Sequence, residues 1–209
     1  MEVWGITGLR GAGKSTAIRH LKELGYPAID ADQVAQIVVN RNTPEGREGF
    51  EAIYKLFGSS VLDNLGNLDK RSLLKRILMN PADRERIEAV VDPLVLKHIE
   101  NVSKDWKSSG KAFGFIEGGR LAEAGFHRVI SGIILVSADI TKRINRVAKR
   151  DSMGKLEVEQ MMTSQIGGLD GDLMRRVAKK EWKNDGTEAA FKKAIDAFVM
   201  ERKAAQASK

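Results

Sequence analysis

The stretch GLRGAGKS, residues 8–15, decides the fold of this 209-residue chain. It fits the pattern G-x-x-x-x-G-K-[ST] at every fixed position. A short apolar run at residues 3–7 precedes it and indicates a buried parallel strand. Residues 15–24, with apolar side chains at helical spacing, follow it. A glycine-rich turn at a strand–helix junction is the alternative, but the Lys-Ser ending favours a loop that binds the phosphates of a nucleoside triphosphate.

The chemistry of such a loop explains each residue type in it. Glycines let backbone N–H groups turn inward around phosphate oxygens, since a Cβ would block the dihedrals or the close approach. The positive end of the following helix adds to this attraction for anions. Lys14 can reach the β- and γ-phosphates, and Ser15 can ligate Mg²⁺. The residues expected to contact the nucleotide here are Gly8, Leu9, Arg10, Gly11, Ala12, Gly13, Lys14, Ser15 and Thr16.

Further along the chain, short apolar runs alternate with helical patterns. Strands are expected at 27–30, 112–116 and 130–136, and residues 31–107 are almost entirely helical in pattern, with one of their breaks at Asp92-Pro93. Helices are also expected at 140–149, with Ile144 and Val147 inside, and at 187–202, before a tail that frays. This alternation predicts an α/β fold of the P-loop NTPase class, a parallel sheet flanked by helices. The helical insertion suggests a separate lobe over the carboxyl edge of the sheet.

Composition excludes several kinds of chemistry. The chain has no cysteine, which removes disulfides and thiolate chemistry, and its three histidines show no metal-ligand spacing. No apolar run is long enough to span a bilayer and no signal peptide is visible, so we expect a cytoplasmic protein with no membrane partner. The net charge of +7 indicates an anionic ligand or a solvated basic surface. No aromatic residue interleaves with the basic run KRINRVAKR, residues 142–150, which favours phosphate over nucleic acid.

Two carboxylates follow the second expected strand. Asp30 and Asp32 stand in IDAD, residues 29–32, next to the phosphate loop in any sheet of this class. A phosphoryl-transfer enzyme needs a group that orients or deprotonates the acceptor hydroxyl, and Asp32 is placed for that role. Asp30 can cap the helix that begins near Ala31. On residue chemistry alone, a capping role is as good an interpretation for either residue.

The combination of TGLRGAGKST with LGYPAIDADQVA resembles the dephospho-CoA kinase family. Further matching segments keep their order along the chain: NTP at 42–44, LFG at 56–58, GNLDKRSLL at 66–74, NP at 80–81, DPLV at 92–95, RVAKRD at 146–151 and NDG at 184–186. The resemblance implies phosphorylation of the ribose 3′-hydroxyl of dephospho-CoA by ATP, with Mg²⁺ as cofactor. It also implies a core at 1–32, 110–150 and 173–209, a helical acceptor-binding insertion at about 33–109, and a lid at about 151–172.

The resemblance implies specific residue roles as well. Asp32 would be the acceptor-side base, and Lys14 and Arg146 would complete the catalytic set. Arg146 and Arg150, four residues apart on one helix face, would meet ATP phosphates; a solvated face is the alternative. Asn184 and Gly186 would lie beside the adenine, or form a simple strand–helix turn. We expect a small-molecule substrate, no nucleic-acid partner, and a monomer or small homo-oligomer.

Some segments depart from the family pattern. Asp92 stands where the family usually has histidine, residues 119–123 keep little of an expected P-L-L-[FV]-E run, and Gln165 is followed by IGGL, residues 166–169, without the usual lid arginine. Arg175 or Arg176 could substitute for that arginine. Glu117, ending the third strand, could stand near Mg²⁺, although a helix-start carboxylate is favoured.

These departures keep two alternative functions open. One is a related P-loop kinase that acts on another nucleotide or nucleoside, since Asp92 and Gly119 fall on the acceptor side. The other is a weakly catalytic ATP-binding protein, which the altered lid around Gly168 suggests.

Overall fold

The computed structural model describes residues 1–165 and 170–208. Its helices and strands are, in chain order, β1 (Glu2–Thr7), α1 (Lys14–Glu23), β2 (Ala28–Asp30), α2 (Ala31–Ile37), α3 (Arg47–Phe57), η1 (Gly58–Val61), α4 (Lys70–Met79), α5 (Pro81–Ser108), β3 (Phe113–Glu117), η2 (Phe126–Arg128), β4 (Gly132–Ser137), α6 (Ile140–Asp151), α7 (Lys155–Gln165), α8 (Asp170–Val177), β5 (Ala178–Lys183) and α9 (Glu188–Ala207). The chain divides into two compact units: a sheet unit, residues 1–28 with 111–209, and a helical unit, residues 29–110.

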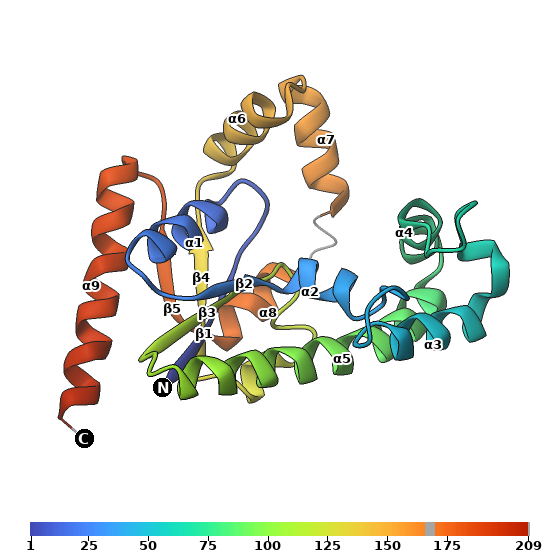
Figure 1. Ribbon diagram of the computed structural model, residues 1–209. Helices are drawn as coiled ribbons and strands as arrows, with labels where there is room; N and C mark the ends of the chain where they lie inside the picture. Colours follow the sequence, from blue (N-terminus) through green and yellow to red (C-terminus); the bar gives the residue numbers. More distant parts are fainter. Residues whose placement is uncertain (166–169, 209) are drawn as a thin grey trace. The chain divides into compact units, whose positions relative to one another are not determined.

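The described strands form a sheet in the order β2-β3-β1-β4-β5 (Figure 1). β1 pairs in parallel with both β3 and β4, and β4 pairs in parallel with β5. The central strand β1 leads into the phosphate loop, residues 8–15, so this loop emerges at the carboxyl edge of the sheet. The predicted parallel α/β fold is confirmed.

Alternating side chains of the strands divide the core between the two faces of the sheet. On one face, Ile134 and Val136 pack with α1 and α9, as do Trp4 and Ile6 of β1. Between them in the sequence, Leu135 points to the other face and packs against α8. Both faces are therefore covered, which explains why the central strands are apolar throughout.

The structure differs from what was expected or left open at four segments. Residues 151–172, where no helix was expected, include α7 and the start of α8; α7 packs Val158 and Met162 against Val147 of α6. β5 was not predicted, because Trp182 alone is buried in its otherwise polar sequence. β4 begins at Gly132 rather than at residue 130, and α9 continues to Ala207 through most of the expected frayed tail.

Helix α5 runs unbroken through Pro93, where a break was expected. A proline inside a helix removes one backbone hydrogen bond and costs about 3 kcal/mol. Apolar residues on both sides of Pro93, namely Ile87, Val95 and Ile99, are buried in the helical unit. Burial of such side chains contributes about 1.5–3 kcal/mol each, which is enough to keep the helix continuous across the proline.

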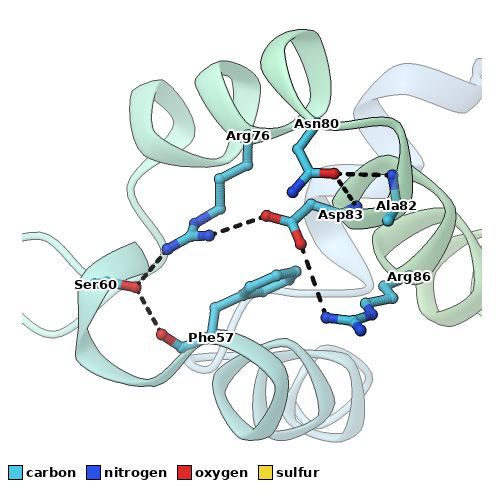
Figure 2. Close-up of polar contacts among 7 residues, drawn as sticks. All are labelled: Phe57, Ser60, Arg76, Asn80, Ala82, Asp83 and Arg86. Carbon is cyan, nitrogen blue, oxygen red and sulfur yellow. Dashed lines mark hydrogen bonds and ion pairs between the residues drawn. The ribbon is translucent and has the colours of Figure 1, made fainter.

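A buried carboxylate joins three elements of the helical unit. Asp83 of α5 accepts a hydrogen bond from Arg76 of α4 at 3.0 Å, and Arg86 lies 3.9 Å away on its other side. Arg76 also donates to Ser60 of η1 and lies over the Phe57 ring, 4.9 Å from its centroid. Figure 2 shows this cluster, with Asn80 capping the first turn of α5. We call these residues the Asp83 cluster; their contacts fix α4 and η1 against α5.

Candidate nucleotide site

The phosphate loop turns through backbone conformations that side chains rarely adopt. Gly8 has φ of 148°, and a Cβ there would come within 2.2 Å of the Val136 carbonyl oxygen. Gly13 has φ of 115°, and a Cβ there would meet the Asn184 amide nitrogen at 2.2 Å. α1 begins directly after Gly13 without a side-chain cap. Its first N–H groups are therefore available to an anion, as nucleotide binding requires.

The Lys14 and Ser15 side chains lie on the loop in positions suited to phosphate and metal. Lys14 Nζ donates to the Gly8 carbonyl at 2.8 Å, so its ammonium group spans the loop. Ser15 Oγ donates to Glu117 Oε1 at 3.1 Å. Leu9 and Thr16 complete the set expected from sequence; the Leu9 carbonyl accepts from Ala12 N, and Thr16 lies in the first turn of α1.

The pair of Ser15 and Glu117 brings a hydroxyl and a carboxylate together at the ends of two neighbouring elements. Mg²⁺ binds through one or two such oxygens, together with substrate phosphates and water. The residues present therefore fit Mg²⁺, although no group of three or more carboxylates, histidines or cysteines forms within the described ranges. The favoured interpretation of Glu117 as a helix-start carboxylate is wrong, because turns and bends follow β3 and no helix begins there.

Side chains from α6 and from the end of β5 hold the phosphate loop by its carbonyl groups. Arg146 donates to the carbonyls of Gly11 at 3.2 Å and Ala12 at 3.3 Å, and to the Asn184 carbonyl at 2.7 Å. The buried Asn184 side chain also donates to Ala12 O, at 2.8 Å. Because these side chains bind the Gly11 and Ala12 carbonyls, those oxygens point away from the centre of the loop. The backbone N–H groups can then face the centre, where a phosphate would bind.

Arg143 is a supporting residue of the loop that the sequence analysis missed. It is buried, and its Nε donates to the Arg10 carbonyl at 2.9 Å. Burial lowers the pKa of the Arg143 guanidinium. Its position three residues before Arg146 on α6 is the only sequence signal that could have indicated this role.

Arg146 and Arg150 do not share a contact in the structure. Arg146 engages loop carbonyls, which makes the solvated-face alternative wrong for it. Arg150 pairs with Asp151, at 2.6 Å from Nε to Oδ1 and 2.9 Å from Nη2 to Oδ2. Asp151 Oδ2 also accepts from Arg10 of the phosphate loop at 2.7 Å. The two arginines, Arg150 first and Arg10 second, hold the pKa of the Asp151 carboxyl far below its usual range.

Residues 184–186 form the turn between β5 and α9. Asn184 N donates to the Ser137 carbonyl, and Asp185 Oδ1 accepts from Asp139 N at 2.7 Å. Lys142 donates to the Asp185 carbonyl. A Cβ at Gly186 would make only an ordinary contact, 3.7 Å from Ala190. The strand–helix turn is therefore present, and adenine contact at Asn184 and Gly186 stays a prediction.

In the helical unit, Asp30 caps α2 as expected. Its Oδ1 accepts from Asp32 N at 2.8 Å and from Gln33 N at 3.3 Å. Asp32 lies in the first turn of α2 with an exposed side chain, a suitable place for a carboxylate that must reach a substrate. A cavity of about 290 Å³ in the same unit is lined by residues near the start of α3 and along α5, His98 among them.

Two of the residues that depart from the family pattern, Asp92 and Gly119, lie within the described part of the chain. Asp92 lies within α5, half-buried, and Gly119 lies in the bend after β3, where a Cβ would meet nothing within 4 Å. Gly168 lies outside the described residues. Arg175 of α8 lies 4.0 Å from Glu181, and its part in the lid stays a prediction.

The fold and the phosphate loop together define a P-loop kinase. Solved structures agree: protein TT1252 from Thermus thermophilus superposes with a TM-score of 0.74 at 28% identity, covering 96% of this chain and 97% of that one. The dephospho-CoA kinase from Campylobacter jejuni shares the fold at 22% identity, with a TM-score of 0.66 over 95% and 96% of the two chains.

The family follows from sequence comparison. The family model described as dephospho-CoA kinase matches residues 2–190. A dephospho-CoA kinase from Geobacter metallireducens is 32% identical over 166 residues, 79% of this chain and 81% of that protein. One from Anaeromyxobacter dehalogenans is 30% identical over 166 residues, 79% and 77% of the two proteins. The chain belongs to the dephospho-CoA kinase family. Within the described part of the chain, no helix has the length and apolar character needed to cross a membrane.

Proposed function

We propose that this protein transfers the γ-phosphoryl group of ATP to the ribose 3′-hydroxyl of dephospho-CoA, forming coenzyme A and ADP. The observation that carries this proposal is the family match over residues 2–190. A phosphate loop with Lys14 and Ser15 in place supports ATP as the donor. The relatives' names support dephospho-CoA as the acceptor.

In the proposed reaction Asp32 is the general base. The proton of the 3′-hydroxyl passes to an oxygen of the Asp32 carboxylate as the hydroxyl oxygen forms a bond to the γ-phosphorus. The bond between that phosphorus and the oxygen bridging to the β-phosphate breaks, and ADP leaves. The exposed position of Asp32 in the first turn of α2, with Asp30 taking the capping role, supports this assignment.

The nucleotide-side residues stabilise charge and hold the loop. Lys14 and the N–H groups at the start of α1 bind the β- and γ-phosphates. Ser15 and Glu117 would hold Mg²⁺, which neutralises charge on the phosphate oxygens when bound. Arg146 acts through the loop carbonyls, Arg150 faces the phosphates, and Asn184 and Gly186 lie beside the adenine. A cytoplasmic location, a monomer or small homo-oligomer, and the absence of a nucleic-acid partner stay predictions.

An ADP-release assay with several acceptors tests the proposal. The purified protein is given ATP and Mg²⁺ with dephospho-CoA, adenosine, or a nucleoside monophosphate. We expect turnover with dephospho-CoA to exceed that with the other acceptors by at least about 100-fold, because a site built to bind one acceptor's polar groups rejects analogues that lack them. Turnover with a monophosphate and none with dephospho-CoA would assign the protein to another kinase activity. ATP binding without transfer to any acceptor would identify a weakly catalytic nucleotide-binding protein.

A further inference from the structure

One carboxylate links two arginines that come from different elements of the sheet unit. Asp151 stands at the last position of α6, and its Oδ2 accepts both from Arg10 at 2.7 Å and from Arg150 at 2.9 Å. Arg10 belongs to the phosphate loop, whereas Arg150 precedes Asp151 on α6. Arg10 also donates to the sulfur of Met161 on α7, at 3.6 Å. Asp151 therefore connects the loop to the helix pair α6 and α7, and we call Arg10, Arg150 and Asp151 the Asp151 cluster.

The two arginines keep hydrogen-bonding capacity and exposure beyond their contacts with Asp151. Each guanidinium carries five N–H donors in a planar fork. The side chains of Arg10 and Arg150 are 39% and 58% exposed. Two guanidiniums and one carboxylate leave a net charge of +1 in the cluster. Arg10 is a residue of the phosphate loop, so the cluster lies beside the anion that the loop binds.

Holding two arginines close together requires an anion between them. Like charges at short range repel, and without a carboxylate the flexible Arg10 and Arg150 side chains would separate into solvent. The depressed pKa of the Asp151 carboxyl, caused first by Arg150 and then by Arg10, keeps this residue charged throughout the physiological range. Asp151 therefore stays ionised at neutral pH and can accept from both arginines, and an incoming phosphate can use the donors that remain.

We propose that Asp151 is a positioning residue that holds Arg10 and Arg150 together so that both guanidiniums bind the triphosphate of the nucleotide. This inference rests on the proposed function in one respect, that the phosphate loop binds ATP. Arg10 then supplies, from the loop, a positive charge that the segment after Gln165 does not offer, because residues 166–169 are IGGL. A competing possibility is that Asp151 acts as a latch, from which phosphate must pull the arginines away.

Calorimetric binding of a non-hydrolysable ATP analogue with Mg²⁺ separates these possibilities without any acceptor. We expect Asp151→Asn to lower the affinity for the analogue by roughly tenfold, because it removes a charge-assisted hydrogen bond. Asp151→Glu keeps the carboxylate and should restore affinity to within about threefold of wild type. If the asparagine variant fails to fold, the glutamate variant and Arg10→Gln provide the same test. Arg10→Gln should also lower the affinity for the analogue by roughly tenfold.

A multiple-mutant cycle distinguishes positioning from general support of the fold. In a background carrying Arg10→Gln and Arg150→Gln, Asp151→Asn should change analogue affinity by less than about twofold, because Asp151 acts through those arginines. The matched control is Glu2→Gln. Glu2 binds Arg202 through two hydrogen bonds of 3.0 and 2.7 Å, but at the opposite end of β1 from the phosphate loop. This control should leave analogue affinity unchanged.

Four results would overturn the inference. Tighter analogue binding by Asp151→Asn would show a latch, and unchanged binding would show no role for this carboxylate. An equally large loss in the arginine-free background would show that Asp151 only supports the fold. Because the assay contains no acceptor, each of these results can be read even if dephospho-CoA proves not to be the substrate. Failure of the wild type to bind the analogue would overturn both this inference and the proposed function.

Discussion

Two clusters in this protein share one composition, a single aspartate between two arginines, but differ in their surroundings. In the Asp83 cluster, Arg76 divides its donors between Asp83 and Ser60 and lies over the Phe57 ring (Figure 2). The Asp83 side chain is 11% exposed. In the Asp151 cluster, the Asp151 side chain is 22% exposed, and one of its two arginines, Arg10, belongs to the phosphate loop.

The comparison indicates that the residues around such a cluster, rather than its own residue types, determine whether it stabilises the fold or binds a ligand. Contacts of the Asp83 cluster lie between η1, α4 and α5 and are directed inward, so its removal should cost stability. The Asp151 cluster keeps donors that face solvent beside a site for anions, so its removal should cost affinity. The following variants test this division between the two units, from the largest expected effect to the smallest.

Lys14→Ala should produce the largest functional loss. Its ammonium group, which donates to the Gly8 carbonyl in the structure, binds the β- and γ-phosphates in the proposed reaction. We expect kcat/KM to fall by roughly 10³-fold, as for loss of a charge-stabilising group in phosphoryl transfer, with weaker ATP binding. Steady-state kinetics and calorimetry measure the two effects. A variant that retained more than a tenth of wild-type activity would remove Lys14 from the catalytic set.

Asp32→Asn should lower kcat without weakening ATP binding. As a positioned general base, Asp32 should account for roughly 10²-fold or more in kcat. Asparagine keeps the size of the side chain, and the capping bonds of α2 are made by Asp30, so the helix should not be disturbed. Asp30→Asn is the matched control, with a small effect on rate. An equal loss of ATP affinity in Asp32→Asn would instead make Asp32 a metal ligand or a structural residue.

Asp83→Asn should lower stability without changing nucleotide binding. It leaves Arg76, a half-buried arginine, without its charged partner, which should cost about 2–3 kcal/mol in the free energy of unfolding. Urea unfolding measures this loss, and calorimetry with the ATP analogue should show affinity within about twofold of wild type. A tenfold change in analogue affinity would contradict the assignment of the Asp83 cluster to stability and the Asp151 cluster to nucleotide binding.

The smallest effect is expected for Glu2→Gln, and it should depend on pH. Arg202 first, and Trp4 after it, lower the pKa of Glu2 to about 2, from an ordinary value of 4.5. A carboxylate with a depressed pKa in the folded state contributes stability above pH 4.5 and loses it as the pH falls toward 2. At neutral pH the substitution should therefore cost about 2 kcal/mol. The difference in unfolding free energy between wild type and variant should shrink between pH 4.5 and pH 2; a constant difference would contradict the assigned cause.

The sheet and the phosphate loop could be predicted because their signals are local. Residues 8–15 fit a motif in which each position has its own physical reason, and the apolar run of β1 can only be a buried strand before it. The cap at Asp30 and the inward side of Val147 on α6 follow from short-range rules in the same way.

What could not be predicted depends on contacts between distant segments. Nothing near Arg146 in the sequence shows that its guanidinium donates to the carbonyls of Gly11 and Ala12. The continuity of α5 through Pro93 results from burial of residues on either side of it in the helical unit. β5 was not predicted because it is an edge strand in which only the Trp182 side chain is buried, so its sequence lacks the apolar pattern of a strand.

The most direct test of the proposed reaction is the position of the transferred phosphate. Phosphorus and proton NMR of the product from ATP, Mg²⁺ and dephospho-CoA would show to which atom the new phosphomonoester is attached. We predict phosphorus coupling to the ribose H3′ proton, one ADP formed per product, and product formation slowed roughly 10³-fold in Lys14→Ala. A phosphate on any other atom, or consumption of ATP without a phosphorylated acceptor, would contradict the assignment of this protein as a dephospho-CoA 3′-kinase.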